Sequence, residues 1–486
     1  MKQKVFIALI VCITLIGFFL RFWNYSERFG LAYDQAHDAV VAREALREGK
    51  IPLVGPFSSA GPFQTSGTWY WLLMIPTALY RSSVSTPWVF LTFLYVMMIY
   101  MVGMFGRKIE GNLFGILIAL LTALSTAQIA QSVNLTNQTP IPVFVFLSLF
   151  CAYYYLKKNT VISAFGMGLF AGLAASIHLQ GMSLAIVVFL ALFLGGVTMR
   201  TFFSAFFGAL LPMLPIVLWD TKNDFFTIRN MFYYYRYDQF NISLDVLGRR
   251  WLTYLTEFWP KEWAHIIGGV PGIAVGIVMG AVFFFIIRFF QKKVRRFWFL
   301  IFFSFFGMAV IVRYTRVPIF SSFITFMHPF VLFITAWTLY QTFRLHKFVG
   351  AVVLIFVLFF TVQKTYKEVF SFHTNNSART SKFIRTELMT LFPGEKFSFY
   401  DWKYEEAGRS VPAALYMDEK HLLDPNGRKI GFSRHSPEDS LMTPVISTAS
   451  GMLIDYSSTT SAYLLENGWI GVNPWDIYRE TEEWRE

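Results

Sequence analysis

Two aspartates near the start of the chain have the spacing that carboxylate chemistry needs. Asp34 and Asp38 lie in the segment 33–47, whose composition is helical and which stops before Gly49 and Pro52. Residues four apart share one face of a helix, so we expect both carboxylates to point toward the same space. A carboxylate in such a place can take a proton from a substrate. An alternative stays open, in which Asp34 caps the helix as its N-terminal residue.

The chain around these aspartates has the composition of a membrane protein. Of its 486 residues, 55% are hydrophobic and 15% are charged, and the mean hydropathy is +0.47. A hydrophobic chain rarely keeps carboxylates beside its membrane surface without a use for them. Cys12 and Cys151 lie inside apolar runs, so no disulfide framework or metal cluster is suggested.

Eleven apolar runs are long enough to cross a bilayer, which takes about 17–25 residues. They cover residues 4–22, 86–106, 112–133, 140–156, 160–178, 182–199, 201–219, 265–287, 297–313, 320–342 and 346–362. No small-residue cleavage site follows the first run, so it is not a cleavable signal. The sequence therefore predicts a polytopic α-helical membrane protein with about eleven transmembrane helices.

The distribution of charge predicts how these helices are oriented. With the N-terminus inside, fourteen Lys and Arg fall on the cytoplasmic side against a single acid, Glu110. The other eleven acids before residue 363 fall in two external loops, 23–85 and 220–264. None lies in the middle of a helix, where coupled carriers usually keep an ionisable group, which argues against a transporter. We expect a multi-pass protein of the inner or plasma membrane.

The segment 363–486 differs from the rest of the chain. It holds 14 Lys and Arg against 18 Asp and Glu, so the net charge of +12 comes from the membrane part. The excess of Lys and Arg there is explained by the orientation of the helices in the membrane, because cytoplasmic loops are rich in cations. Nucleic acid is therefore not expected as a partner. Alternation at 396–400 and 452–456 predicts strands, and 377–391 predicts a helix. We expect a transmembrane domain over 1–362 and a small α/β extracytoplasmic domain over 363–486, which could select the acceptor.

The first external loop suits an enzyme that acts on a lipid-linked substrate. The run GPFSSAGPFQTSG, residues 55–67, is rich in Gly, Pro and Ser and predicts an irregular segment. Residues 69–80 are apolar, but they are too few to span a bilayer, and Pro76 interrupts them, which predicts an interfacial helix. Arg43 and Arg47 continue the face of the two aspartates, where ion pairs are the simplest role.

This order of features resembles the GT-C membrane glycosyltransferases, and among them bacterial relatives of the protein O-mannosyltransferases and of the lipid A aminoarabinose transferase. Residues 34–39 read DQAHDA, like a motif DQGRDA of a bacterial subgroup, and residues 54–59 read VGPFSS, like I-G-P-x-x-S. Residues 66–71 read SGTWYW, like HGPLYYY. Ala36 and His37 depart from the Gly and Arg of the motif, as Ser-Gly-Thr departs from His-Gly-Pro. If the family's Arg and His contact the donor phosphate, this chain uses another contact or another donor.

The resemblance implies roles for residues of several external segments. The base at the acceptor would be Asp34, with Asp38 orienting it or binding a sugar hydroxyl. The run NLTNQTPIP, residues 134–142, resembles the family's second external site, where Asn134, Asn137 and Gln138 would offer amides to sugar hydroxyls. An ordinary polar connection between two helices is the alternative. The substrate-binding residues that we predict are His37, Asn134, Asn137, His178, Gln180, Arg313, Arg316 and His328.

The phosphate of a polyprenyl carrier needs positive charge when it leaves. Arg313 and Arg316, at the external end of the ninth helix, are candidates for this contact, with His328 inside the tenth. Snorkelling of the arginines to lipid head groups is the alternative. His178 and Gln180 resemble a Gln/His pair of the family, and an interfacial position is the alternative for His178. No cofactor is assigned, and a divalent cation stays open.

The sequence thus predicts a GT-C-type glycosyltransferase with Asp34 as base. It would pass a sugar from a polyprenyl-phosphate donor to a lipid, glycan or protein acceptor at the external face, among membrane lipids. One alternative is a transporter, whose lateral or central pathway would dominate the structure in place of a cavity beneath the first loop. Another is a noncatalytic assembly subunit for envelope glycans.

Overall fold

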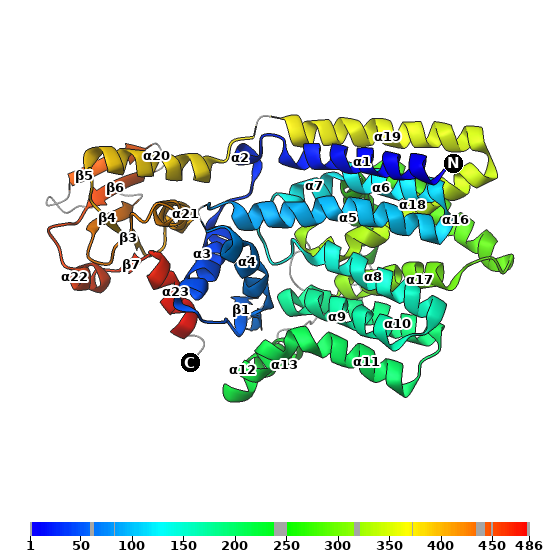
Figure 1. Cartoon of the computed structure of the whole chain (residues 1–486), viewed down its shortest axis with the longest axis horizontal. Coiled ribbons are helices and arrows are strands. Elements are labelled where there is room, and N and C mark those ends of the chain that lie inside the picture. Colours follow the sequence, from blue (N-terminus) through cyan, green and yellow to red (C-terminus); the bar gives the residue numbers. More distant parts are fainter. Residues whose placement is uncertain are drawn as a thin grey trace.

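The computed structural model of the chain is a helix bundle with a small mixed domain at one end (Figure 1). It describes residues 2–58, 63–81, 83–237, 250–314, 321–371, 373–433, 443–448 and 451–483. Arg316 and Ser59, which the sequence analysis singled out, lie outside these ranges.

Long apolar helices form the bundle. They are α1 (Gln3–Phe22), α5 (Thr86–Glu110), α6 (Asn112–Leu124), α7 (Thr126–Ser132), α8 (Ile141–Lys158), α9 (Val161–Ile177), α10 (Ala185–Gly195), α11 (Met199–Leu210), α12 (Leu214–Lys222), α16 (Pro271–Phe290), α17 (Arg296–Arg313), α18 (His328–Leu345) and α19 (Lys347–Phe370). Helix α13 (Phe226–Tyr237), α15 (Trp259–Ile267) and the short turns η1 (Leu179–Leu184), η2 (Leu211–Met213), η3 (Tyr254–Phe258) and η4 (Ser321–Met327) connect them.

The predicted polytopic helical class is confirmed, with fewer full-length spans than predicted. Within the described residues, 8 helical segments are long and apolar enough to cross a membrane, and the bent pair α6–α7 makes up to 9. Two further predicted runs correspond to shorter apolar helices, Val161–Ile177 and Leu179–Gly195. The last helix, α19, continues to Phe370, beyond the predicted end at 362.

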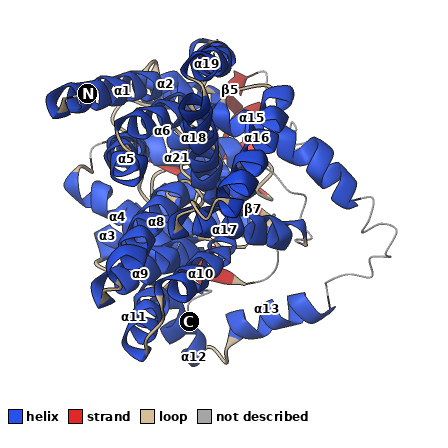
Figure 2. Ribbon diagram, turned by 90° about the vertical axis from the view of Figure 1, so that its right-hand side faces the viewer, coloured by secondary structure: helices blue, strands red, loops and turns tan. Residues whose placement is uncertain are grey.

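The bend between α6 and α7 has a local cause. The two axes differ by 56° at Ser125. The hydroxyl of Ser125 accepts the backbone N–H of Gln128 and donates to the carbonyl of Ile266, while the hydroxyl of Thr126 donates to the carbonyl of His265. These bonds replace the helical pattern at the break and tie it to α15. In Figure 2, α18 lies inside the bundle and α19 at its edge, in line with the near-complete burial of α18 and the exposure of α19.

The first loop contains α2 (Tyr25–Arg28), α3 (Tyr33–Glu48), β1 (Val54–Phe57), β2 (Gln64–Ser66) and α4 (Thr68–Leu79). The predicted helices over 33–47 and 69–80 thus correspond to α3 and α4. Helix α3 ends at Gly49, whose φ of +67° favours glycine. The prediction of an irregular segment over 55–67 is wrong, because β1 and β2 pair antiparallel. Gly55 and Pro56 of the predicted segment lie in β1 itself, and residues 59–62 lie outside the described residues.

The C-terminal part is an α/β domain. It contains α20 (Asn376–Leu391), β3 (Phe397–Trp402), α21 (Ala407–Asp418), β4 (Arg428–Ser433), β5 (Thr443–Thr448), β6 (Gly451–Asp455), α22 (Ser461–Glu466), β7 (Trp469–Gly471) and α23 (Pro474–Glu483). The sheet order is β5-β6-β4-β3-β7, with β3 and β4 parallel and the other pairs antiparallel. The strands and the helix that the sequence predicts here correspond to β3, β6 and α20.

Helix α3 connects this domain to the bundle. Arg43 Nη2 and Arg47 Nη2 lie 3.1 and 2.8 Å from the two carboxylate oxygens of Asp418, at the end of α21. The backbone N–H of Val84 donates to Glu419, which also pairs with Arg385 at 2.9 Å. Helices α21 and α23 lie beside α3 in Figure 1. The helix that carries the two aspartates is therefore held from outside the membrane part.

Candidate active site

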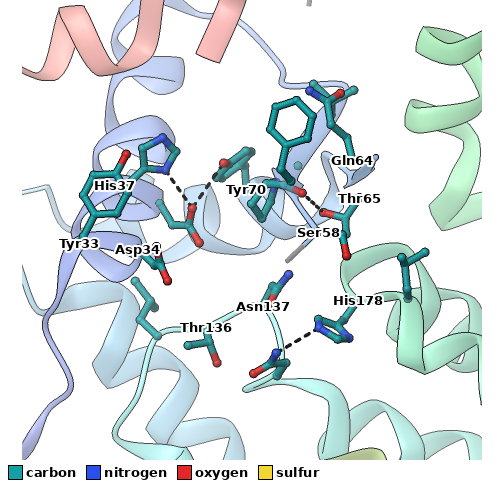
Figure 3. A pocket seen from close by; sticks show the side chains of 18 of the residues that line it. Tyr33, Asp34, His37, Ser58, Gln64, Thr65, Tyr70, Thr136, Asn137 and His178 are labelled. Atoms are coloured by element: carbon teal, nitrogen blue, oxygen red, sulfur yellow. Dashed lines mark hydrogen bonds and ion pairs between the residues drawn. The ribbon is translucent and has the colours of Figure 1, made fainter. Parts of the chain in front are cut away.

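A cavity of about 630 Å³ lies beneath the first loop, within the range of about 300–1,000 Å³ that is usual for small-molecule sites. Its walls come from α3, the β1–β2 hairpin, the start of α4, the connection between α7 and α8, and the segments that begin η1 and η4. The polar residues that line it are Tyr33, Asp34, His37, Asp38, Ser58, Gln64, Thr65, Tyr70, Thr136, Asn137, Gln138 and His178. No Lys or Arg lies among the described lining residues. Figure 3 shows Asp34 and His37 on one side and Asn137 and His178 on the other.

Asp38 is buried, and three side chains hold its carboxylate. Trp69 Nε1 donates to Oδ2 at 2.7 Å, and the hydroxyl of Tyr70 donates to Oδ1 at 3.4 Å. His37 Nδ1 lies 3.2 Å from the same Oδ1. These contacts join α3 to the first turn of α4, so the aromatic residues of the SGTWYW segment serve this carboxylate. The two donors and the adjacent imidazole fix this carboxylate in position.

Asp34 lies one helical turn from Asp38 and differs from it in exposure and in hydrogen-bond partners. It is exposed to the cavity, and no side chain among the described residues hydrogen-bonds or ion-pairs with it. Its pKa is raised above the ordinary value, first by partial burial and then by the negative charge of Asp38, while His37 opposes the shift. A raised pKa makes a carboxylate a stronger proton acceptor once it is ionised.

The alternative role of Asp34 as a helix cap does not hold. Helix α3 begins at Tyr33, and the capping position is Ala32, whose backbone is extended. The side chain of Gln35 accepts the backbone N–H of Ala32 at 3.0 Å. Asp34 is the second residue of the helix, where the helix dipole favours a negative charge without fixing it.

The opposite wall presents neutral amides and an imidazole. His178 Nδ1 accepts the backbone N–H of Gln180 at 3.3 Å, and its Nε2 lies 3.0 Å from the amide of Gln138. Asn137 lines the cavity beside this pair. Amides in this arrangement suit the hydroxyl groups of a sugar.

Other residues that the sequence singled out lie away from the cavity lining. Asn134 is engaged locally, because its Oδ1 accepts from Gln35 at 3.3 Å and from the backbone of Leu135 at 2.9 Å. Gln180 reaches the site only through its backbone N–H to His178.

Two predicted phosphate contacts are not brought to the cavity either. Arg313, at the end of α17, is buried with its guanidinium over the ring of Trp251, 5.6 Å from the centroid. His328 is buried at the start of α18, with Nδ1 2.8 Å from the side chain of Gln128. Within the described part of the chain, no group of three or more His, Cys, Asp or Glu could hold a metal ion.

Several residues of the site were missed in the sequence. Tyr33, Ser58, Thr65 and Thr136 line the cavity, although no role was assigned to them. Gln138, which the sequence offers for sugar hydroxyls, lines the cavity as well. Ser58 lies inside the VGPFSS segment and Thr136 inside the run NLTNQTPIP, so the motifs marked the right segments and not every side chain.

The sequence matches no family model, and it matches no curated protein. In structure, the chain is similar to ArnT from Cupriavidus metallidurans in the apo state, with a TM-score of 0.61 and 11% identity over 94% of this chain and 99% of ArnT. It is also similar to that ArnT bound to undecaprenyl phosphate, with a TM-score of 0.57 and 10% identity over 95% of this chain and 99% of ArnT.

A third solved structure extends the likeness to an archaeal enzyme. The oligosaccharyltransferase AglB from Archaeoglobus fulgidus, in complex with an inhibitory peptide and a dolichol-phosphate, has a TM-score of 0.51 and 12% identity over 89% of this chain and 70% of AglB. Identities this low report the fold alone, which this chain shares with ArnT and AglB.

Proposed function

We propose that the protein is a membrane glycosyltransferase that takes a sugar from a polyprenyl-phosphate donor, with Asp34 as the general base. One observation carries the proposal: a carboxylate without a partner among the described residues, with a raised pKa, faces a polar cavity in a GT-C fold. The other cavity residues have complementary roles. Asp38 positions Asp34, and Asn137 and Gln138 bind sugar hydroxyls.

The proposed reaction is a single displacement at the anomeric carbon, with inversion. A nucleophilic oxygen or nitrogen of the acceptor attacks that carbon and forms the new glycosidic bond. The bond between the anomeric carbon and the phosphate oxygen breaks, and its electron pair leaves with the polyprenyl phosphate. The acceptor proton goes to the Asp34 carboxylate. Such positioned base catalysis typically contributes about 10²–10⁴-fold to a rate.

The neighbouring structures support a carrier lipid as part of the substrate. ArnT was solved with undecaprenyl phosphate, and AglB with a dolichol-phosphate and a peptide. A lipid, a glycan or a protein is the acceptor class that we propose here. His37, which lines the cavity, is the donor contact that we propose, while Arg313 and Arg316 stay predictions. Both the divalent cation and the extracytoplasmic position of residues 363–486 stay predictions as well.

The position of the cavity favours a transferase over a transporter. A transporter predicts a lateral or central pathway through the helices, whereas this cavity is walled by the first loop itself, through α3, β1 and β2. Helix α3 is also fixed to α21 through Asp418, which suits a rigid reaction site more than a moving gate.

The test is sugar transfer by purified protein from a radiolabelled polyprenyl-phosphate donor pool into cell-envelope acceptors. Asp34→Asn keeps the shape of the side chain and removes the base. The matched control is Glu48→Gln, on the same helix and exposed, with its carboxylate 2.9 Å from Lys50. We expect Asp34→Asn to lose transfer and the control to keep it. Unchanged transfer by Asp34→Asn would exclude Asp34 as the base, and no transfer by wild type would favour a transporter or an assembly subunit.

A further inference from the structure

A second polar cavity has a volume of about 200 Å³. The helix ends that line it lie at the end of the bundle away from α3 in Figure 1. The cavity is formed where α5 ends, α16 ends, α17 begins and α18 ends. Its charged residues are Glu110, Arg288, Lys293, Arg295 and Arg344, and Trp298, Trp337 and Gln341 complete its polar and aromatic walls. Four cations therefore surround one acid. All five charged residues belong to the set that the sequence places on the cytoplasmic side.

The single acid of this cavity is already engaged. Glu110 Oε1 accepts the indole N–H of Trp298 at 2.8 Å, and Arg295 Nη1 lies 3.6 Å from it. The same guanidinium donates to the backbone carbonyl of Ile109. Glu110 and Arg295 thus compensate each other, and the indole fixes the carboxylate in place.

Three cations of the cavity remain without an acidic partner among the described residues: Arg288, Lys293 and Arg344. Arg288 is held in place, because its Nη2 donates to the buried Gln341 at 2.9 Å. Lys293 and Arg344 are exposed at the mouth. Uncompensated cations that converge on one hollow, with one of them fixed by a neutral buried side chain, make a site for an anion.

The surroundings of the cavity indicate which anion this is. Apolar side chains beside it point outward, with Phe289 51%, Phe290 78%, Leu345 73% and Phe348 71% exposed. Such a surface suits acyl chains, because these helices are apolar enough to lie in a membrane. The cavity is smaller than the roughly 300–1,000 Å³ of whole small-molecule sites, so it can take a head group and not an entire lipid.

We infer that this cavity binds the phosphate head group of an anionic phospholipid at the membrane surface. Basic hollows between transmembrane helices on the cytoplasmic side are suited to such head groups. Arg288 and Arg344 contact the phosphate, Lys293 closes the mouth, and the acyl chains lie along α16 and α19. The site is separate from the Asp34 cavity and does not depend on the proposed transfer reaction.

The experiment measures lipid binding to the detergent-purified protein by native mass spectrometry. The probes are phosphatidylglycerol and phosphatidylcholine with identical acyl chains, and inorganic phosphate alone. We expect wild type to bind phosphatidylglycerol at least about tenfold more tightly than phosphatidylcholine, and Arg288→Gln/Arg344→Gln to bind it about 30-fold more weakly than wild type does. Millimolar inorganic phosphate should leave the lipid bound.

The control is Lys157→Gln/Lys158→Gln, which removes the same charge from exposed residues at the end of α8, outside the cavity. Equal weakening by the control would overturn the site, because general surface charge would then explain the binding. Equal affinity of wild type for the two lipids would overturn it as well, and displacement by phosphate would assign the cavity to the free anion. If the double variant fails to fold, the exposed Lys293→Gln replaces it, with an expected loss of several-fold.

Discussion

The two halves of α3 place their charged residues in different surroundings. The N-terminal half places Asp34 and Asp38 on the cavity wall, and Asp34 has no partner among the described residues. The C-terminal half places Arg43 and Arg47 against Asp418 of α21, within 3.1 Å of its carboxylate oxygens. One helix thus contains both an unpaired carboxylate and an ion-pair network.

This difference shows how a chemical group can be identified in a charged segment. The ion pairs at the α3–α21 contact stabilise the folded protein, and this stabilisation is enough to explain why the charges are there. An unpaired carboxylate in a cavity loses the stabilisation of a partner and has no structural explanation of its own. Under the proposed function, the first half of α3 supplies the reaction chemistry and the second half positions it. Each prediction below tests one half against the other.

The largest effect is expected for Asp34→Asn. Because the side chain is exposed and has no partner among the described residues, its replacement should leave the thermal unfolding midpoint unchanged. Transfer activity should fall by about 10²–10⁴-fold, the usual contribution of a general base. Measuring kcat/KM and the unfolding midpoint on the same preparation separates the two. A loss of stability in step with activity would refute the contrast between the halves.

Asp418→Asn should give the reverse pattern. Its buried carboxylate accepts from Arg43 Nε at 3.1 Å and from Arg47 Nη2 at 2.8 Å. Losing it should destabilise the α3–α21 contact by about 2 kcal/mol, below the roughly 3–5 kcal/mol of a fully buried pair because Arg47 is partly exposed. Limited proteolysis of residues 376–483 and the unfolding midpoint measure this, with Glu387→Gln at a half-buried position of α20 as the control. A stability equal to that of the control would show that the contact does not hold the domain.

Asp38→Asn tests how the cavity tunes its base. The negative charge of Asp38 is one cause of the raised pKa of Asp34, so removing it should lower that pKa. Activity is lost as pH falls and Asp34 is protonated, so the acid limb of kcat/KM should move to lower pH in the variant. We also expect a roughly tenfold lower kcat, since Trp69 and Tyr70 lose a charged acceptor. An acid limb at the wild-type position would mean that Asp34 is not the group that titrates.

The sequence predicted the parts of this comparison to different degrees. The helical composition of 33–47 and the stop at Gly49 were enough for the approximate bounds of α3, and the spacing of Asp34 and Asp38 was enough for their shared face. Membrane spans were found from hydropathy, although a break such as Ser125 depends on carbonyls of α15, more than 130 residues away in the chain. The partners of Asp38 and Arg43 could not be predicted either, because no local pattern in the sequence shows which distant side chain will form a hydrogen bond with a given group.

The arginine predictions show the same limit. Arg313 was chosen for its place at a helix end, where both a phosphate contact and a packing role fit the sequence. Only the tertiary arrangement distinguishes these roles, and it puts the guanidinium over Trp251 and outside the cavity lining. Hydropathy locates the end of a helix and does not say which way its last side chain turns.

The smallest effect is expected for Glu44→Gln, at the boundary between the two halves. Burial raises the pKa of Glu44 from 4.5 to about 7, with Arg47 opposing the shift and Asp418 adding to it. A carboxyl group whose pKa is higher in the folded state stabilises the fold fully below the unfolded value and loses this contribution as pH rises through the folded value. The wild-type unfolding midpoint should therefore fall between about pH 4.5 and 7, and Glu44→Gln should flatten this fall.

The effect is expected to be a few degrees, since about 2–4 °C correspond to 1 kcal/mol in a protein of 150–250 residues and fewer in a longer chain. Arg43, Arg47, Glu48 and Asp418 are the charged groups that also face this position. Glu48→Gln, on the exposed side of the same turn, should leave the pH dependence as in wild type. If both variants flatten the curve alike, the pH dependence belongs to the net charge of α3 and not to the buried carboxyl group.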